Sequence, residues 1–252
     1  MSGHSKWATI KRKKAATDAK RGIVFTRISK DITVAARLGG GDESMNPALR
    51  LAVKSAKAAN MPAANIDRAI KKGTGDLPGQ HFEDFTYEGY GPGGVAIMME
   101  VLTDNKNRTI PEIRHLMTKF NGNLGESGCV NWMFEKKGTI IVPREKVDEE
   151  HLLEQALELG AEDFDSDDDE VFEITTTAED INTVSSGLES AGFEISSGQV
   201  NLEPSNTVKV SGGTASQLLK LLDELEELED IQKVYTNMDI DEDELARLDA
   251  DN

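Results

Sequence analysis

Several features are scarce in this 252-residue chain, and each scarcity argues against a class of protein. There is a single cysteine, Cys129, so no disulfide can form within the chain, which fits a reducing compartment. No apolar run approaches the roughly 18 residues that a membrane-spanning helix needs. Residues 1–7 lack the apolar core of a secretory signal, although a basic, acid-poor start is also typical of organelle transit peptides. We therefore expect a cytoplasmic protein without a membrane partner.

Motifs for catalysis and cofactor binding are scarce as well. The four histidines are scattered, and none has ligand spacing with another or with Cys129. The pattern G-x-x-x-x-G-K-[ST] does not occur, which argues against a P-loop nucleotidase. The acidic run 163–170 lacks the spaced glycine of a calcium loop, and it predicts a solvated turn. We therefore expect a protein that is not an enzyme and that holds no metal and no cofactor.

A glycine-rich stretch at residues 89–94 matches G-x-G-x-x-G, the pattern of dinucleotide-binding loops. That pattern needs a helix N-terminus directly after it, whereas the run 95–102 is nearly all apolar and predicts a buried strand. Pro92 also lacks the backbone N–H that would donate to a phosphate. The stretch therefore predicts a strained turn between two strands.

Positive charge is scarce in most of the chain and concentrated at one end. Residues 1–75 hold 16 Lys and Arg against 5 Asp and Glu, a net of +11, whereas residues 76–252 hold 12 against 41, a net of −29. A basic segment on an acidic protein attracts a polyanion to that segment, because the acidic remainder repels it. We therefore expect nucleic acid, either DNA or ribosomal RNA, to bind the N-terminal domain, and we regard the acidic domains as candidates for a protein partner.

The densest positive charge lies in an arm at residues 6–21, where flexible cations suit phosphate contact. Trp7 lies among these charges and is a candidate to stack on an unpaired base; the alternative is a solvated arm with Trp7 folded back onto the helices. The arm holds no groove-reading motif, so phosphate contact is predicted and sequence specificity is not. On the helix 107–120, Arg108 and Arg114 are further phosphate-binding candidates. The principal nucleic-acid-binding candidates are Lys6, Trp7, Lys11, Arg12, Lys13, Lys14, Lys20, Arg21, Arg27, Lys30, Lys54 and Lys57.

The basic region has the periodicity of three short helices. Apolar residues recur at three- and four-residue steps over 17–38, and Gly39 begins a glycine run that ends this helix. Asn46 is the expected N-cap of a second helix with Pro47 at its first position. Pro62 opens a third helix, for which Gly73 is the expected C-cap. These helices predict a basic helical domain over residues 1–77.

Strands and helices alternate in the acidic remainder. From residue 138 the expected order is strand–helix–strand–strand–helix–strand, the split βαβ or ferredoxin-like pattern. The last helix and strand lack partners of their own, so we hypothesise that they complete the first α/β segment. The expected elements are strands at 85–87, 95–102, 129–134, 139–142, 171–175, 193–195 and 231–235, and helices at 107–120, 152–159, 179–191 and 218–228.

These elements define an α+β fold class with three domains. The N-terminal domain is the basic helical bundle, and the other two are ferredoxin-like α/β domains, one inserted in the other. We assign residues 78–135 and 205–240 to one α/β domain and residues 136–204 to the insertion. The acidic tail 241–252 is expected to be frayed, and residues 122–128 are expected to form a flexible loop.

The sequence contains a specific set of short motifs, at residues 3–7, 18–22, 87–94, 104–109, 122–125, 133–134 and 234–237. Through these motifs the chain resembles the YebC/PmpR proteins, which are described as transcriptional regulators and whose mitochondrial relative is a translational activator. The resemblance covers essentially the whole chain. Asn121 and Cys129 are small departures from the family pattern, and neither lies in the basic arm.

The resemblance implies three domains and a cytoplasmic, non-enzymatic regulator that binds nucleic acid. The family residues that carry over are the basic ones near the N-terminus, which composition also selects. The target stays open. Family members have been described as DNA-binding regulators, and also as ribosome-associated factors that help translation through proline runs. The first is the label that the family carries, whereas the absence of a helix-turn-helix signature favours the second, because contacts with shape and backbone suffice on ribosomal RNA.

Overall fold

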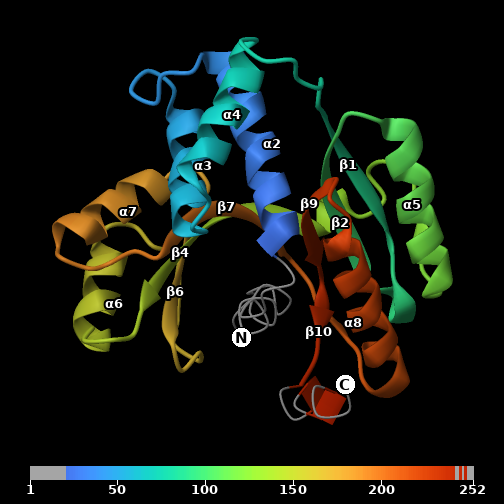
Figure 1. Cartoon of the computed structure of the whole chain (residues 1–252). Coiled ribbons are helices and arrows are strands. Elements are labelled where there is room, and N and C mark those ends of the chain that lie inside the picture. The colour runs from blue at the N-terminus through green and yellow to red at the C-terminus, as the bar shows by residue number, and fades with distance from the viewer. Residues whose placement is uncertain (1–20, 242–243, 246, 249–252) are drawn as a thin grey trace. The chain divides into compact units, whose positions relative to one another are not determined.

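The computed structural model describes residues 21–241, 244–245 and 247–248 (Figure 1). The fold is mixed α+β, and it divides into two compact units. One unit contains residues 132–207. The other contains the helical bundle and an α/β domain that the first unit interrupts in sequence. None of the helices in the described part of the chain is long and apolar enough to cross a membrane.

The bundle consists of α2 (Arg21–Gly39), α3 (Pro47–Ala58) and α4 (Ala63–Thr74). The expected start of α3 is confirmed: Asn46 is its N-cap, its side chain accepts the Leu49 N–H at 3.1 Å, and Pro47 occupies the first turn. The three helices share one small core, which includes the fully buried Ile32 of α2 and Ala69 of α4. The bundle therefore buries its apolar stripes and leaves its charged positions on α3 and α4 outside.

The end of α4 differs from the expectation. Gly73 is not the C-cap but lies inside the helix, and Gly75, with a φ of 89°, ends it in the left-handed conformation. A Cβ at residue 73 would lie 2.5 Å from the Thr33 carbonyl oxygen of α2. Because glycine has no side chain, the backbones of α2 and α4 can approach closely at residue 73, and this close packing fixes the position of α4 on α2.

The interrupted α/β domain has a four-stranded antiparallel sheet in the order β3-β1-β2-β9. Strand β9 pairs with β2 from Ile97↔Thr236 to Val101↔Ile231. This is the pairing required if the last helix and strand complete the first α/β segment, as we hypothesised from the sequence. Along the chain the order of the main elements is strand–strand–helix–strand–helix–strand. The two central strands of the sheet, β1 and β2, are therefore consecutive in sequence and form a hairpin, which differs from the split βαβ order of a ferredoxin-like domain. Its elements are β1 (Glu83–Tyr90), β2 (Ala96–Thr103), α5 (Lys106–Lys119), β3 (Asn123–Leu124), β8 (Val208–Lys209), α8 (Gly212–Glu227), β9 (Ile231–Thr236) and β10 (Met238–Asp239).

The apolar run in β2 is buried on both faces of the sheet. Ile97 and Met99 belong to the core shared with α5 and α8, and both are fully buried. Met98 and Leu102 point to the opposite face, where both are also buried. This two-sided burial is the reason that β2 lacks the polar alternation of a half-exposed strand.

The glycine-rich stretch is the β1–β2 turn, as predicted. A short 3₁₀ turn, Pro92–Gly94, connects the paired strands, and the Gly91 N–H donates to the Val95 carbonyl at 2.8 Å. Gly93 and Gly94 both have a φ of 76°, a conformation that favours glycine. The glycines therefore meet the demands of a tight hairpin.

A buried carboxylate organises the segment that follows β3. Glu88 accepts backbone N–H bonds from Gly128 at 2.7 Å and from Val130 and Asn131 at 2.8 Å each. Burial alone would raise the pKa of Glu88, but these three donors outweigh it and hold the pKa below its usual value. Residues 122–128, which we expected to form a flexible loop, are therefore held against β1 by the bond from Gly128, the last residue of that segment.

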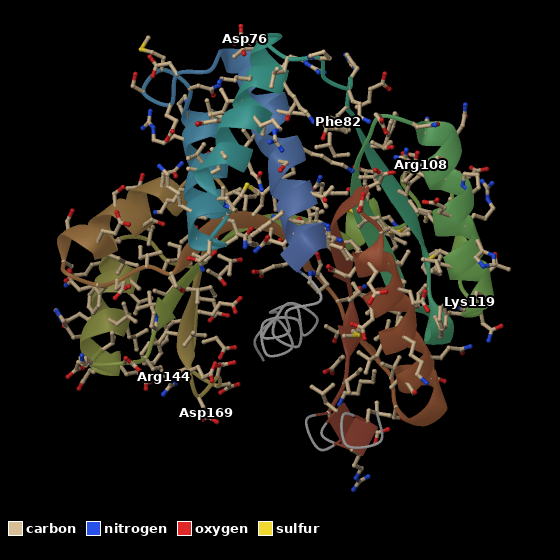
Figure 2. All side chains as sticks on the ribbon, in the orientation of Figure 1. Asp76, Phe82, Arg108, Lys119, Arg144 and Asp169 are labelled. Atoms are coloured by element: carbon tan, nitrogen blue, oxygen red, sulfur yellow. The ribbon has the colours of Figure 1, made fainter. Side chains whose placement is uncertain are left out.

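The inserted domain has the ferredoxin-like sheet order β5-β6-β4-β7. The acidic run 163–170 is not only a turn, because its first three residues form the edge strand β5. Figure 2 labels Asp169, from the remainder of this run, and Arg144 at the same end of the domain. Residues 131–133 form a 3₁₀ turn instead of the expected strand, and the last strand starts at Ser197 instead of Phe193. The elements are β4 (Phe134–Pro143), α6 (Glu149–Glu158), β5 (Asp163–Asp165), β6 (Val171–Thr177), α7 (Ile181–Ser190) and β7 (Ser197–Pro204).

The described residues of the acidic tail contact the α/β domain. Leu245 and Leu248 are partly buried against its core. The Glu244 carboxylate accepts the Gly212 N–H at 2.6 Å, at the N-terminus of α8, where negative charge is favoured. The expectation of a frayed tail is therefore wrong for these residues.

Candidate nucleic-acid interface

The predicted nucleic-acid-binding residues fall into three groups in the structure. The arm lies outside the described residues, except that α2 begins at Arg21. Two candidates from α2, Arg27 and Lys30, are hereafter the inner cations. Their side chains are only 11% and 9% exposed. Two candidates from α3, Lys54 and Lys57, are exposed on the surface.

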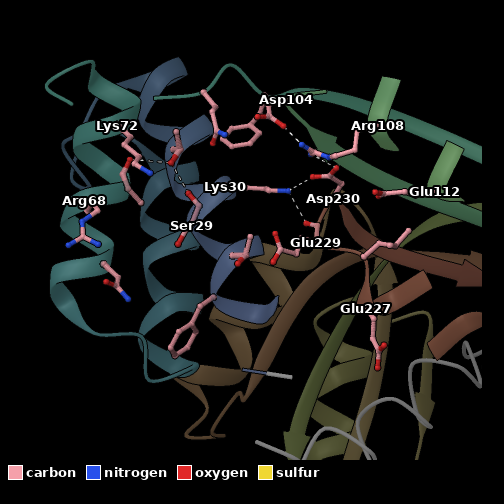
Figure 3. A pocket seen from close by; sticks show the side chains of 18 residues that line it. Ser29, Lys30, Arg68, Lys72, Asp104, Arg108, Glu112, Glu227, Glu229 and Asp230 are labelled. Atoms are coloured by element: carbon pink, nitrogen blue, oxygen red, sulfur yellow. Dashed lines mark hydrogen bonds and ion pairs between the residues drawn. The ribbon is translucent and has the colours of Figure 1, made fainter. Parts of the chain in front are cut away.

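Helix α4 adds exposed cations to those of α3. Figure 3 shows Arg68 and Lys72 on α4 beside a cavity. Lys57 lies 3.8 Å from the Glu43 carboxylate, a loose pair between two exposed side chains that contributes little. We name this set the outer cations: Lys54, Lys57, Arg68, Lys71 and Lys72.

The inner cations bind carboxylates of the α/β domain. The Lys30 ammonium donates to Asp230 Oδ1 at 2.7 Å and to the Glu229 carbonyl at 2.8 Å (Figure 3). It also donates to the Leu102 carbonyl at 3.2 Å. Arg27 forms an ion pair with Glu226 at 3.3 Å. These contacts join α2 to the end of α8, to the loop between α8 and β9, and to β2.

Asp230 is the centre of this cluster. Besides Lys30, its carboxylate accepts from Arg108 at 2.6 Å, from the Thr109 hydroxyl at 2.7 Å and from the Thr103 hydroxyl at 3.1 Å. Burial would raise the pKa of Asp230, but the bonds from Arg108, Lys30 and Thr109 outweigh it and lower the pKa to about 2. We name Lys30, Thr103, Arg108, Thr109 and Asp230 the Asp230 cluster.

The structure therefore gives three predicted phosphate contacts a different role. Arg27 and Lys30 are enclosed by carboxylates and carbonyls, so their charges are compensated within the protein. Arg108 also pairs with Asp104 at 3.1 Å, and its bond to Asp230 is the largest cause of a raised guanidinium pKa. We withdraw these three from the candidate interface and add Arg68, Lys71 and Lys72.

Sequence reasoning missed the role of Asp230 because its partners lie far away along the chain. Lys30 and Asp230 are 200 residues apart, and Arg108 and Asp230 are 122 apart. A local signal did exist at the start of α5. Asn105 caps this helix by accepting the Arg108 N–H at 3.2 Å, which presents the following residues to the end of β2.

Among the described residues, no group of three or more His, Cys, Asp or Glu is arranged to hold a metal ion.

The fold and the site together define a multidomain α+β protein with a basic helical domain joined to an α/β domain. Two family models match the chain. One, described as the TACO1/YebC protein N-terminal domain, matches residues 5–76, and the other, described as the TACO1/YebC second and third domain, matches residues 82–238. The chain therefore belongs to the TACO1/YebC family.

Individual relatives agree with this assignment. A probable transcriptional regulatory protein of Chlorobaculum tepidum is 51% identical over 251 residues, covering 100% of both chains. Another protein of that name, from Persephonella marina, is 54% identical over 241 residues, covering 95% of this chain and 96% of its own. The crystal structure of a conserved hypothetical protein from Aquifex aeolicus matches with a TM-score of 0.85 at 51% identity, covering 94% of this chain and 98% of its own.

Proposed function

We propose that the protein is a cytoplasmic, nucleic-acid-binding regulator of gene expression and that it acts by binding rather than by catalysis. The observation that carries the proposal is the set of outer cations, which are exposed on α3 and α4. Exposed Lys and Arg side chains can neutralise phosphates and release their counterions, which supplies most of the affinity of sequence-independent binding. Residues 6–21 add further cations at the same end of the chain.

The first candidate for the target is DNA. Relatives that match nearly the whole chain are named probable transcriptional regulatory proteins. The helical domain would bind the phosphate backbone, and the strongly acidic inserted domain would repel it, which leaves that domain to a protein partner. In this case the protein acts at promoters.

The second candidate is ribosomal RNA, and one observation favours it. The exposed positions of α3 and α4 are occupied mainly by Lys, Arg, Ala and Ser. The Lys and Arg side chains among them contact phosphates on any nucleic acid, and they can also read guanine in the DNA major groove, but no helix-turn-helix signature presents them to that groove. Backbone and shape contacts suffice for a structured RNA. In this case the protein acts on translation.

One experiment separates the two candidates. The protein is crosslinked to nucleic acid in cells, and the bound nucleic acid is purified and sequenced. Enrichment of defined promoters supports the first candidate, and enrichment of ribosomal RNA supports the second. A variant with Lys54→Ala, Lys57→Ala and Lys71→Ala serves as the matched control, because loss of either signal in it attributes the contact to the helical domain. Failure to recover either nucleic acid above an uncrosslinked control would overturn the proposal.

A further inference from the structure

A cavity of the bundle-containing unit lies where the bundle meets the α/β domain. Its volume is about 710 Å³, which falls within the roughly 300–1,000 Å³ range of small-molecule sites. The volume is too small for a duplex and suits one nucleotide of a single strand. The paired charges of Lys30, Arg108 and Asp230 line this cavity, so the Asp230 cluster holds its two sides together.

The two sides of the cavity carry opposite charge. Arg68 and Lys72 lie on one side, on α4, and Glu112 and Glu227 lie on the other, on α5 and α8 (Figure 3). Arg68 and Lys72 form no ion pair with any described residue, whereas the other two cations that line the cavity are paired with Asp230. A ligand with an anionic group at one end and hydrogen-bond donors at the other matches this arrangement.

Aromatic rings and small polar groups complete the lining. Phe25 and Phe82 are both half-buried, so each ring leaves part of its surface toward the cavity. Aromatic rings stack on unpaired bases of any sequence, at about 1–3 kcal/mol per base. Ser29 and Asn65 add a hydroxyl and an amide to the lining. The lining therefore offers groups for each part of a nucleotide.

We propose that this cavity binds one unpaired nucleotide of a nucleic-acid strand, with its phosphate at Arg68 and Lys72 and its base against Phe82. This inference rests on the proposed function, since it takes the bound nucleic acid as the source of the nucleotide. The carboxylates on the far side accept hydrogen bonds but cannot donate them. They accept from the two N–H bonds of an exocyclic amino group, which adenine, cytosine and guanine carry, whereas uracil and thymine offer the single N3–H, so the amino-bearing bases are favoured.

The test uses the full-length protein and fluorescence-labelled single strands of equal length, made of adenine, cytosine or uracil nucleotides alone. We expect adenine and cytosine strands to bind roughly tenfold more tightly than the uracil strand. In Glu112→Ala with Glu227→Ala, which removes the accepting carboxylates, this base preference disappears while the uracil strand still binds. In Phe82→Leu, which keeps apolar bulk but removes the aromatic face, all three strands bind more weakly, because stacking does not depend on the base. A fluorescent adenine analogue in the strand reports base insertion directly, through an emission change that the wild type gives and Phe82→Leu does not.

The phosphate contact is tested by Arg68→Ala with Lys72→Ala. The matched control is Lys209→Ala with Lys220→Ala, which removes the same charge at exposed positions outside the cavity. We expect the first pair to lower the slope of log affinity against log salt by about 1.4 for a single strand, and the control to leave it nearly unchanged. Circular dichroism and thermal unfolding show whether each variant is folded.

The outcomes separate the two proposals. If strands bind equally whatever their base, or if the control pair weakens binding as much as the cavity pair, the nucleotide site is overturned and the general phosphate contact stands. If no strand and no duplex binds the wild type, the proposed function fails and the nucleotide site fails with it.

Discussion

Two sets of cations in the helical domain have the same chemistry and opposite surroundings. The inner cations Arg27 and Lys30 are almost buried and bind carboxylates of the α/β domain. The outer cations on α3 and α4 are exposed to solvent. A basic sequence therefore indicates a nucleic-acid-binding surface only where the fold supplies no carboxylate to pair with its cations. In this protein the cations of α2 connect the helical domain to the α/β domain, whereas those of α3 and α4 remain free to bind a partner.

The largest expected effect comes from removing the anion that compensates the inner cations. Asp230→Ala leaves Lys30 and Arg108 without their shared acceptor at a site where the Asp230 side chain is 8% exposed. Removing one partner of a buried pair costs about 3–5 kcal/mol, because an uncompensated charge remains. Urea unfolding should therefore show a loss of this size.

Lys30→Met is the companion variant for this prediction. It removes the buried ammonium and still fills its volume, while Asp230 keeps Arg108 as a partner. We expect it to cost less than Asp230→Ala. Hydrogen exchange should then place the faster-exchanging amides of Asp230→Ala in α2 and at the start of β9. A loss below about 1 kcal/mol for Asp230→Ala would mean that the cluster does not join the two domains.

The outer cations should affect binding instead of stability. In a variant with Lys54→Ala, Lys57→Ala and Lys71→Ala, we expect the slope of log affinity against log salt to fall by about 2.7 for duplex DNA, or about 2 for a single strand. Near physiological salt, binding should weaken on the order of 100-fold. Titrations of a labelled oligonucleotide at several salt concentrations measure both quantities.

The inner cations provide the contrast for that measurement. Lys30→Met should leave the salt slope unchanged, since its charge is compensated by Asp230. The comparison between inner and outer cations breaks down if Lys30→Met lowers the slope as much as any one of the outer substitutions. It also breaks down if the triple variant binds with the wild-type slope.

Acid should weaken the inner contacts by a smaller amount. The pKa of Asp230 falls from 3.8 to about 2 on folding, so its contribution to stability is present above pH 3.8 and is lost as the pH falls to about 2. The shift corresponds to about 2 kcal/mol. Over this window the unfolding free energy of the wild type should fall by about that much more than that of Asp230→Asn, which cannot titrate. Parallel curves for the two proteins would contradict the assigned pKa.

Local signals were sufficient for much of the fold. Asn46 and Pro47 define the start of α3, and the glycines between β1 and β2 have the backbone conformation of a hairpin turn. The apolar run of β2 predicts a strand buried on both faces, which the structure confirms. Each of these features depends on neighbours within a few residues, and such neighbours can be recognised in a single sequence.

Features that depend on distant partners could not be predicted. Gly73 has the sequence position of a helix end, but its role comes from the Thr33 backbone of another helix. Asp163 begins a strand despite its charge, because pairing with β6 decides the structure of that segment. Lys30 has the sequence environment of a phosphate contact, and only the folded position of Asp230 gives it another role.

An exposed ion pair gives the smallest predicted effect and isolates what burial contributes. Lys119, labelled on α5 in Figure 2, lies 3.0 Å from Glu224 of α8, at nearly the same separation as Lys30 from Asp230. Both side chains of this pair are more than 40% exposed. Water screens such a pair and the two side chains lose mobility, so Lys119→Ala should cost less than about 1 kcal/mol, and added salt should reduce that cost further. Urea unfolding of Lys119→Ala, Glu224→Ala and the double variant measures the coupling free energy. A coupling as large as the roughly 3–5 kcal/mol expected for the loss of Asp230 would mean that burial is not the property that separates the inner cations from the exposed ones.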